Sequence, residues 1–104
     1  MTPAESMIGS EDDDATLIPE HGGRVRIERV DAGGDGVRAR VALATPDGVT
    51  RGEATVRDGV VVLDVRGAPE WLESWARALL VTLAKRAGEG EAWPRVVVRW
   101  RERK

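Results

Sequence analysis

Three copies of the tripeptide Asp-Gly-Val constrain the fold of this chain more than any other feature. They occupy residues 35–37, 47–49 and 58–60, so they recur after 12 and 11 residues. Asp-Gly before a β-branched residue favours a tight hairpin turn, because glycine readily adopts the positive φ that such turns need. Regular turns at this spacing predict an antiparallel meander with strands at about residues 24–30, 37–45, 49–56 and 60–66.

One helix is expected after the meander. Pro69 suits the first helical position, and the basic residues Lys85 and Arg86 suit the last turn, before Gly88 ends the helix. Apolar residues recur at intervals of three and four along this segment: Leu72, Trp75, Ala76, Leu79, Leu80, Leu83 and Ala87. A single apolar stripe needs one apolar partner surface, so we expect the helix to cover one face of the sheet.

The last twelve residues, WPRVVVRWRERK, predict a fifth strand at about residues 95–101. The fold class is therefore expected to be α+β, an antiparallel four-strand meander, one helix on one sheet face and a C-terminal strand, in the order ββββαβ. A chain of 104 residues is long enough for one domain with a modest core.

Charge divides the chain into two parts. Residues 1–20 hold six acidic residues and no basic one, and the remaining 84 residues hold 16 basic and 12 acidic residues, a net charge of +4. Residues 12–14 are a run of like charges, which resists packing, and Gly22 and Gly23 follow. We therefore expect a flexible acidic tail over residues 1–23 and a single domain over residues 24–104.

Composition excludes several classes of protein. The chain contains no cysteine, so a disulfide scaffold, a thiol nucleophile and a zinc–thiolate site are ruled out. No apolar run approaches the roughly 20 residues of a membrane span, and the acidic N-terminus is the opposite of a secretion signal. The expected protein is soluble and cytoplasmic and has no membrane partner.

Strand alternation predicts which side chains face the helix. The expected inward rows are Val25 and Ile27; Val37, Ala39, Val41 and Leu43; Ala54 and Val56; Val61, Leu63 and Val65; and Val96, Val98 and Trp100. The opposite rows form what we call the helix-free face, the sheet face that the helix does not cover. They hold ten arginines against three carboxylates, a net charge of +7: Arg24, Arg26, Arg38, Arg40, Arg51, Arg66, Arg95, Arg99, Arg101 and Arg103 against Glu28, Glu53 and Asp64.

An apolar centre within this basic surround predicts an interface on the helix-free face. The residues expected to form it are Arg38, Arg40, Arg51, Val60, Val62, Arg66, Arg95, Val97, Arg99, Arg101 and Arg103. The favoured function is a small non-catalytic binding or assembly module that binds a protein partner or forms a weak homodimer. A plain solvated face stays open as an alternative, because any one-sided antiparallel sheet alternates in this way.

Binding of nucleic acid or another polyanion on the same face is the second hypothesis. An arginine-rich sheet can follow phosphates, and the acidic tail would compete with them. Sheet-based single-strand binders also expose aromatic side chains on which bases stack, whereas Trp100 is expected in the core and Trp71 and Trp93 at its rim. An exposed Trp100 would therefore favour this hypothesis.

Catalytic chemistry has little support, and a small enzyme is the most distant alternative. His21 adjoins the tail, and Ser6, Ser10 and Ser74 have no neighbouring base in a recognisable arrangement. No cofactor or metal motif is present: the glycines at 33–36 lack a following Gly-Lys-Ser/Thr, and residues 12–14 lack the spacing of a calcium loop. Glu53 and Asp64 could pair if their strands align, or they could neutralise neighbouring arginines.

Overall fold

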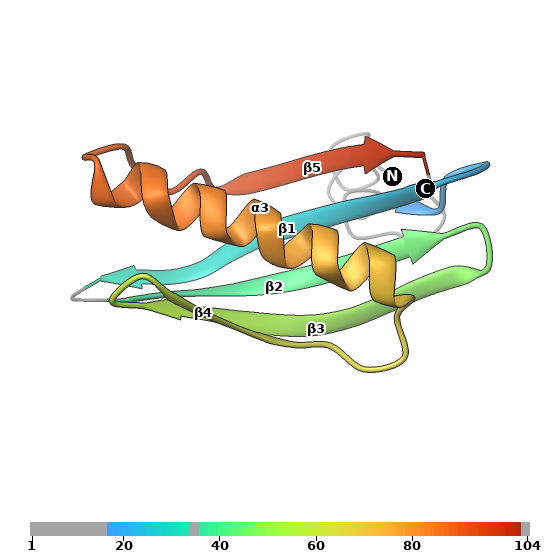
Figure 1. Cartoon of the computed structure of the whole chain (residues 1–104), viewed down its shortest axis with the longest axis horizontal. Coiled ribbons are helices and arrows are strands. Elements are labelled where there is room, and N and C mark those ends of the chain that lie inside the picture. The colour runs from blue at the N-terminus through green and yellow to red at the C-terminus, as the bar shows by residue number, and fades with distance from the viewer. Residues whose placement is uncertain (1–16, 34–35, 103–104) are drawn as a thin grey trace, which may run out of the picture.

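The computed structural model describes residues 17–33 and 36–102 of the chain. Its elements follow the order ββββαβ, which confirms the predicted α+β fold (Figure 1). They are β1 (Gly23–Gly33), β2 (Gly36–Thr45), β3 (Gly48–Arg57), β4 (Val60–Asp64), α3 (Glu70–Gly88) and β5 (Val96–Arg101).

The five strands form one sheet in the order β4-β3-β2-β1-β5, and every neighbouring pair is antiparallel. The second and third Asp-Gly-Val copies stand at junctions between two strands, as predicted, and Asp35 of the first copy lies outside the described residues. The turn between β3 and β4 shows the reason most clearly. Asp58 and Gly59 both have positive φ, 53° and 78°, which is the backbone that a two-residue hairpin with right-handed twist requires.

Helix α3 lies across one face of the sheet (Figure 1), and the hydrophobic core lies between the two. Leu72, Ala76 and Leu80 are fully buried on the helix, and Trp71, Trp75 and Trp93 pack at the edge of the same core. The inward rows predicted for the first four strands supply the sheet side: Val25, Ile27, Ala39, Val41, Leu43, Ala54, Leu63 and Val65 in the core, Val61 packed against it, and Val56 buried as well. Val37 is half-buried.

The prediction for β5 is wrong, because this strand presents the opposite row to the helix. Val97 is buried in the core with 8% of its surface exposed, opposite Ile27 of β1. Val96, Val98 and Trp100 have 37%, 44% and 43% of their surface exposed and face away from the helix.

The helix makes few contacts with β5. Helix α3 packs mainly on β4, β2 and β1. Only Val97 of β5 belongs to the buried core cluster. On the same side of the strand, the guanidinium carbon of Arg101 lies 5.4 Å from the ring centre of Trp75, a distance typical of a cation–π contact. An arginine on the helix side therefore has an aromatic partner.

Gly52 of β3 marks a close approach of two strands and generates a stability prediction. A Cβ at this position would overlap the carbonyl oxygen of Asp64 and lie 3.0 Å from Cα of Val65, which are backbone atoms that cannot rotate away. We expect Gly52→Ala to lower the free energy of unfolding by about 1–3 kcal/mol, measured by urea denaturation.

Gly88→Ala is the matched control for this substitution. Gly88 ends α3, and a Cβ added there meets no heavy atom within 4 Å. The control should leave stability unchanged or raise it by up to about 1 kcal/mol, because alanine has the higher helix propensity. Equal stability of Gly52→Ala and the unsubstituted protein would contradict the packing described here.

Candidate functional site

Cross-strand register defines the helix-free face, because residues directly opposite each other in antiparallel strands share one face. Its side chains, strand by strand from β4 to β5, are Val60, Val62 and Asp64; Val49, Arg51, Glu53, Thr55 and Arg57; Arg38, Arg40, Ala42 and Ala44; Arg24, Arg26, Glu28 and Asp31; and Val96, Val98 and Trp100. The face thus has apolar residues on both outer strands and charged residues between them.

The charge of this face is lower than the sequence predicts. Six arginines and four carboxylates project from its strands, a net charge of +2 in place of the predicted +7. The difference arises mainly from β5, whose arginines lie on the helix side, and from Asp31, which stands opposite Arg38. A face with interspersed positive and negative groups is not a simple anion platform.

The predicted interface residues divide into four groups. Arg38, Arg40, Arg51, Val60 and Val62 lie together on the helix-free face, as expected. Arg66 lines a hollow at its β4 border together with Arg51, Glu53 and Asp64. Arg95, Arg99 and Arg101 lie on the helix side, and Val97 is in the core, so the structure removes these four from the face. Arg103 lies outside the described residues.

A depression of about 470 Å³ occupies the middle of the helix-free face. The residues that line it are Arg26, Glu28, Arg40, Val41, Ala42, Arg51, Gly52 and Glu53. Ala42 stands between Arg26 and Arg51 in the strand register, and its small side chain leaves the space between the two longer ones. The depression therefore offers hydrogen-bond donors from three arginines and acceptors from two glutamates.

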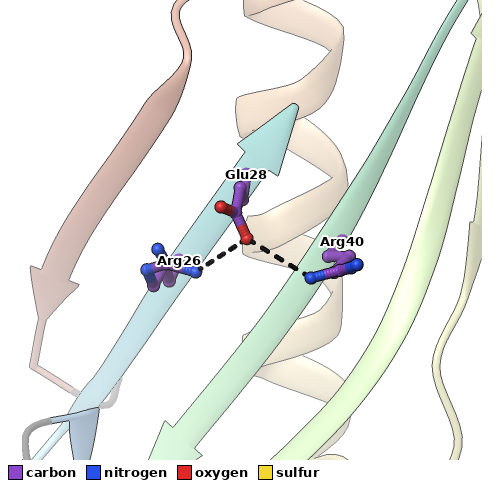
Figure 2. A network of polar contacts seen from close by, with 3 residues as sticks. All are labelled: Arg26, Glu28 and Arg40. Carbon is purple, nitrogen blue, oxygen red and sulfur yellow. Dashed lines mark hydrogen bonds and ion pairs between the residues drawn. The ribbon is translucent and has the colours of Figure 1, made fainter. Parts of the chain in front are cut away.

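Glu28 links two of these arginines. Its Oε1 atom lies 3.4 Å from Nη1 of Arg26 and 3.9 Å from Nη1 of Arg40, and Figure 2 shows the carboxylate between the two guanidinium groups. The side chain of Arg26 is 8% exposed and that of Arg40 is 70% exposed. Arg26 is thus a buried part of the face, whereas Arg40 projects from it and can contact a partner.

The exposed row of β5 borders this depression. Val96, Val98 and Trp100 stand opposite Glu28, Arg26 and Arg24 of β1. The indole nitrogen Nε1 of Trp100 donates a hydrogen bond of 2.8 Å to the carbonyl oxygen of His21, whose ring meets the indole edge-on at 5.3 Å.

His21 also contacts Glu102, with Nδ1 lying 2.7 Å from Oε1. The sequence gives no sign of these contacts, because no local pattern brings His21 next to Trp100. The structure thus gives Trp100 a fixed orientation.

Leu17 packs at one end of the helix-free face. It is 5% exposed and lies against Ala42, Ala44 and Val49, and its carbonyl oxygen accepts a hydrogen bond of 3.4 Å from Nη1 of Arg24. The chain therefore enters the domain along this face. Residues 1–16, which carry the acidic run of the predicted tail, lie outside the described residues.

Glu53 and Asp64 do align, because they stand directly opposite each other in β3 and β4. Arg51 and Arg66 line the same hollow, in positions where they can offset the two like charges. Among residues 17–33 and 36–102, no group of three histidine, cysteine, aspartate or glutamate side chains could hold a metal ion. Within the same residues, no helix combines the length and the apolar character that crossing a membrane requires.

Comparisons with known proteins found no matching family model, no significantly similar curated protein and no significantly similar solved structure.

A pair of neighbouring substitutions tests the orientation of β5. Val97→Ala removes two methyl-sized groups from the core, so we expect it to lower the free energy of unfolding by about 1.5–2.5 kcal/mol. Val98→Ala removes the same atoms from an exposed site, so it should change stability by no more than about 0.5 kcal/mol. Urea denaturation of both variants gives the comparison, and a larger loss for Val98→Ala would mean that the two rows are exchanged.

Proposed function

We propose that this protein is a small non-catalytic binding and assembly module that acts through its helix-free face. The observation that carries this proposal is the exposed row of Val96, Val98 and Trp100 beside a depression lined by both arginines and glutamates. Aromatic side chains and arginine are enriched where proteins bind one another, and exposed tryptophan often contributes much of the binding energy. Val60 and Val62 extend the apolar surface at the opposite border.

The size of the face supports a weak assembly rather than a permanent one. The 42 residues of the five strands, at about 4.8 Å between strands and about 3.3 Å per residue, give a projected area of roughly 670 Å². Stable interfaces bury about 800 Å² on each partner, so an isologous dimer through this face should form only at high protein concentration. We also propose a cytoplasmic location, since a chain without cysteine needs no oxidising compartment.

Sedimentation over a wide concentration range tests this self-association. The protein should pass from monomer to dimer as its concentration rises, and Trp100→Ala should raise the dimer dissociation constant at least about tenfold. Val81→Ala is the matched control, because Val81 is 48% exposed on the helix and should leave the dissociation constant unchanged. A monomer at every concentration up to about 1 mM would contradict the dimer. A dissociation constant above about 1 mM corresponds to a binding free energy of less than about 4 kcal/mol.

Binding of single-stranded nucleic acid is a second candidate function, and the exposure of Trp100 is the observation that favours it. The indole stands opposite Arg24, next to Arg26 and Val98, so a stacked base would lie close to basic groups. The four carboxylates of the same face weaken this candidate, because they repel phosphates.

A labelled oligothymidine distinguishes the two functions by fluorescence anisotropy at low salt. If the second function holds, binding should weaken at least about tenfold in Trp100→Ala and also with rising salt. Replacing residues 12–14 together by asparagine should strengthen binding if the acidic run competes with phosphates. Absence of binding in both the unsubstituted protein and the triple variant would eliminate this function.

A further inference from the structure

The outer edge of β5 has backbone groups that point away from the sheet. Arg29 donates a backbone hydrogen bond of 2.9 Å to the carbonyl of Arg95, which identifies these two opposed residues as a hydrogen-bonded pair. Hydrogen-bonded and non-hydrogen-bonded pairs alternate along an antiparallel ladder. The N–H and C=O groups of Val96, Val98 and Trp100 are therefore directed away from β1, toward the outer edge.

No strand among the described residues pairs with this edge, since β5 ends the strand order. One of its carbonyl groups is covered by a side chain instead. Nη1 of Arg99 donates a hydrogen bond of 2.9 Å to the carbonyl oxygen of Val98, directly before it in the chain. Charged side chains at an edge strand commonly hinder pairing with other chains. The Arg99 side chain is exposed, so an acidic group of a partner can reach it.

The two sides of this edge differ in chemistry. Arg95, Arg99 and Arg101 alternate on the helix side, with Arg101 placed against Trp75. Val96, Val98 and Trp100 alternate on the helix-free face. A strand added beside β5 would therefore place one row of its side chains next to arginines and the other row next to apolar groups.

We propose that the outer edge of β5 accepts an extended acidic segment of a partner protein as a sixth strand. In this complex, acidic side chains of the segment alternate with apolar ones, the carboxylates facing Arg95 and Arg99 and the apolar residues lying beside Val98 and Trp100. Arg99 exchanges the carbonyl of Val98 for a carboxylate of the partner, which releases that carbonyl for the new ladder. This site differs from the proposed face-to-face dimer, because its binding depends on main-chain hydrogen bonds at the sheet edge.

Two labelled peptides of equal composition test this site by fluorescence anisotropy. One alternates glutamate and valine over eight residues, and the other holds the same four glutamates and four valines in two blocks. The alternating peptide should bind at least about tenfold more tightly, because only its carboxylates and valines match the two sides of β5 at the same time. Equal affinity of the two peptides would overturn the proposal.

Val98→Pro is the substitution that separates edge pairing from contact with a face. Proline lacks the N–H group, and at position 98 that group points outward, so the β1–β5 ladder keeps its hydrogen bonds. This variant and Arg99→Glu should each weaken binding of the alternating peptide at least about tenfold. The control Arg57→Glu makes the same charge change on β3 and should leave binding unchanged. Wild-type affinity of Val98→Pro would overturn the proposal.

Amide hydrogen exchange of the unsubstituted protein gives an answer even if the proline variant fails to fold. Saturation with the alternating peptide should newly protect the N–H groups of Val96, Val98 and Trp100. Unchanged exchange at these three amides would overturn the proposal. Protection that rises with protein concentration in the absence of peptide would also overturn it and would identify a second copy as the added strand. Loss of dimerisation in Trp100→Ala with unchanged peptide-induced protection would separate this site from the proposed dimer.

Discussion

Val97 enters the core opposite Ile27, and this contact sets the direction of every other side chain of β5. Since side chains alternate along a strand, burying Val97 turns Val98 and Trp100 to the helix-free face and Arg99 to the helix side. A one-residue slip in the pairing of β5 with β1 would exchange these rows. It would also exchange the backbone groups that face the outer edge. Both the proposed face and the proposed edge therefore depend on this one register.

Ion pairing holds the charged side chains in the middle of the helix-free face in place. Arg26 is almost entirely buried, which is costly for a cation unless an opposite charge lies close by. Glu28, two residues further along β1, provides that charge and also lies near Arg40 of the next strand. Ala42 then leaves room for the depression between the long side chains. The result is a mixed-charge surface beside an apolar row, which suits protein partners better than a uniform polyanion.

Much of the fold could be predicted because its signals are local. Each Asp-Gly turn forms from adjacent residues, and the helix stripe from Leu72 to Ala87 repeats within one segment. The inward rows of β1 to β4 were also predictable, because in each of these strands the row predicted to face the helix contains the core residues. Strand β5 differs, since Val96, Val98 and Trp100 are more apolar as a row than Val97 with its flanking arginines. Counting apolar residues therefore selected the wrong row.

The parts that could not be predicted depend on contacts between distant segments. No local pattern indicates that helix α3 packs mainly on β4, β2 and β1, that Val97 of β5 enters the core, or that Trp75 lies near Arg101. The contact of His21 with Trp100 joins residues 79 positions apart. These contacts decide the charge and exposure of the candidate site, so its position on the sheet was predictable, whereas its composition at β5 was not.

A cysteine scan of β5 measures the orientation of this strand directly. The chain contains no cysteine, so Val96→Cys, Val97→Cys and Val98→Cys each introduce a single thiol whose reaction with a disulfide reagent can be followed without background. The thiols at positions 96 and 98 should react readily, and the thiol at position 97 should react at least about tenfold more slowly, because it becomes accessible only when the strand opens. A fast reaction at position 97 with protection at positions 96 and 98 would contradict the register on which the proposed face and edge depend.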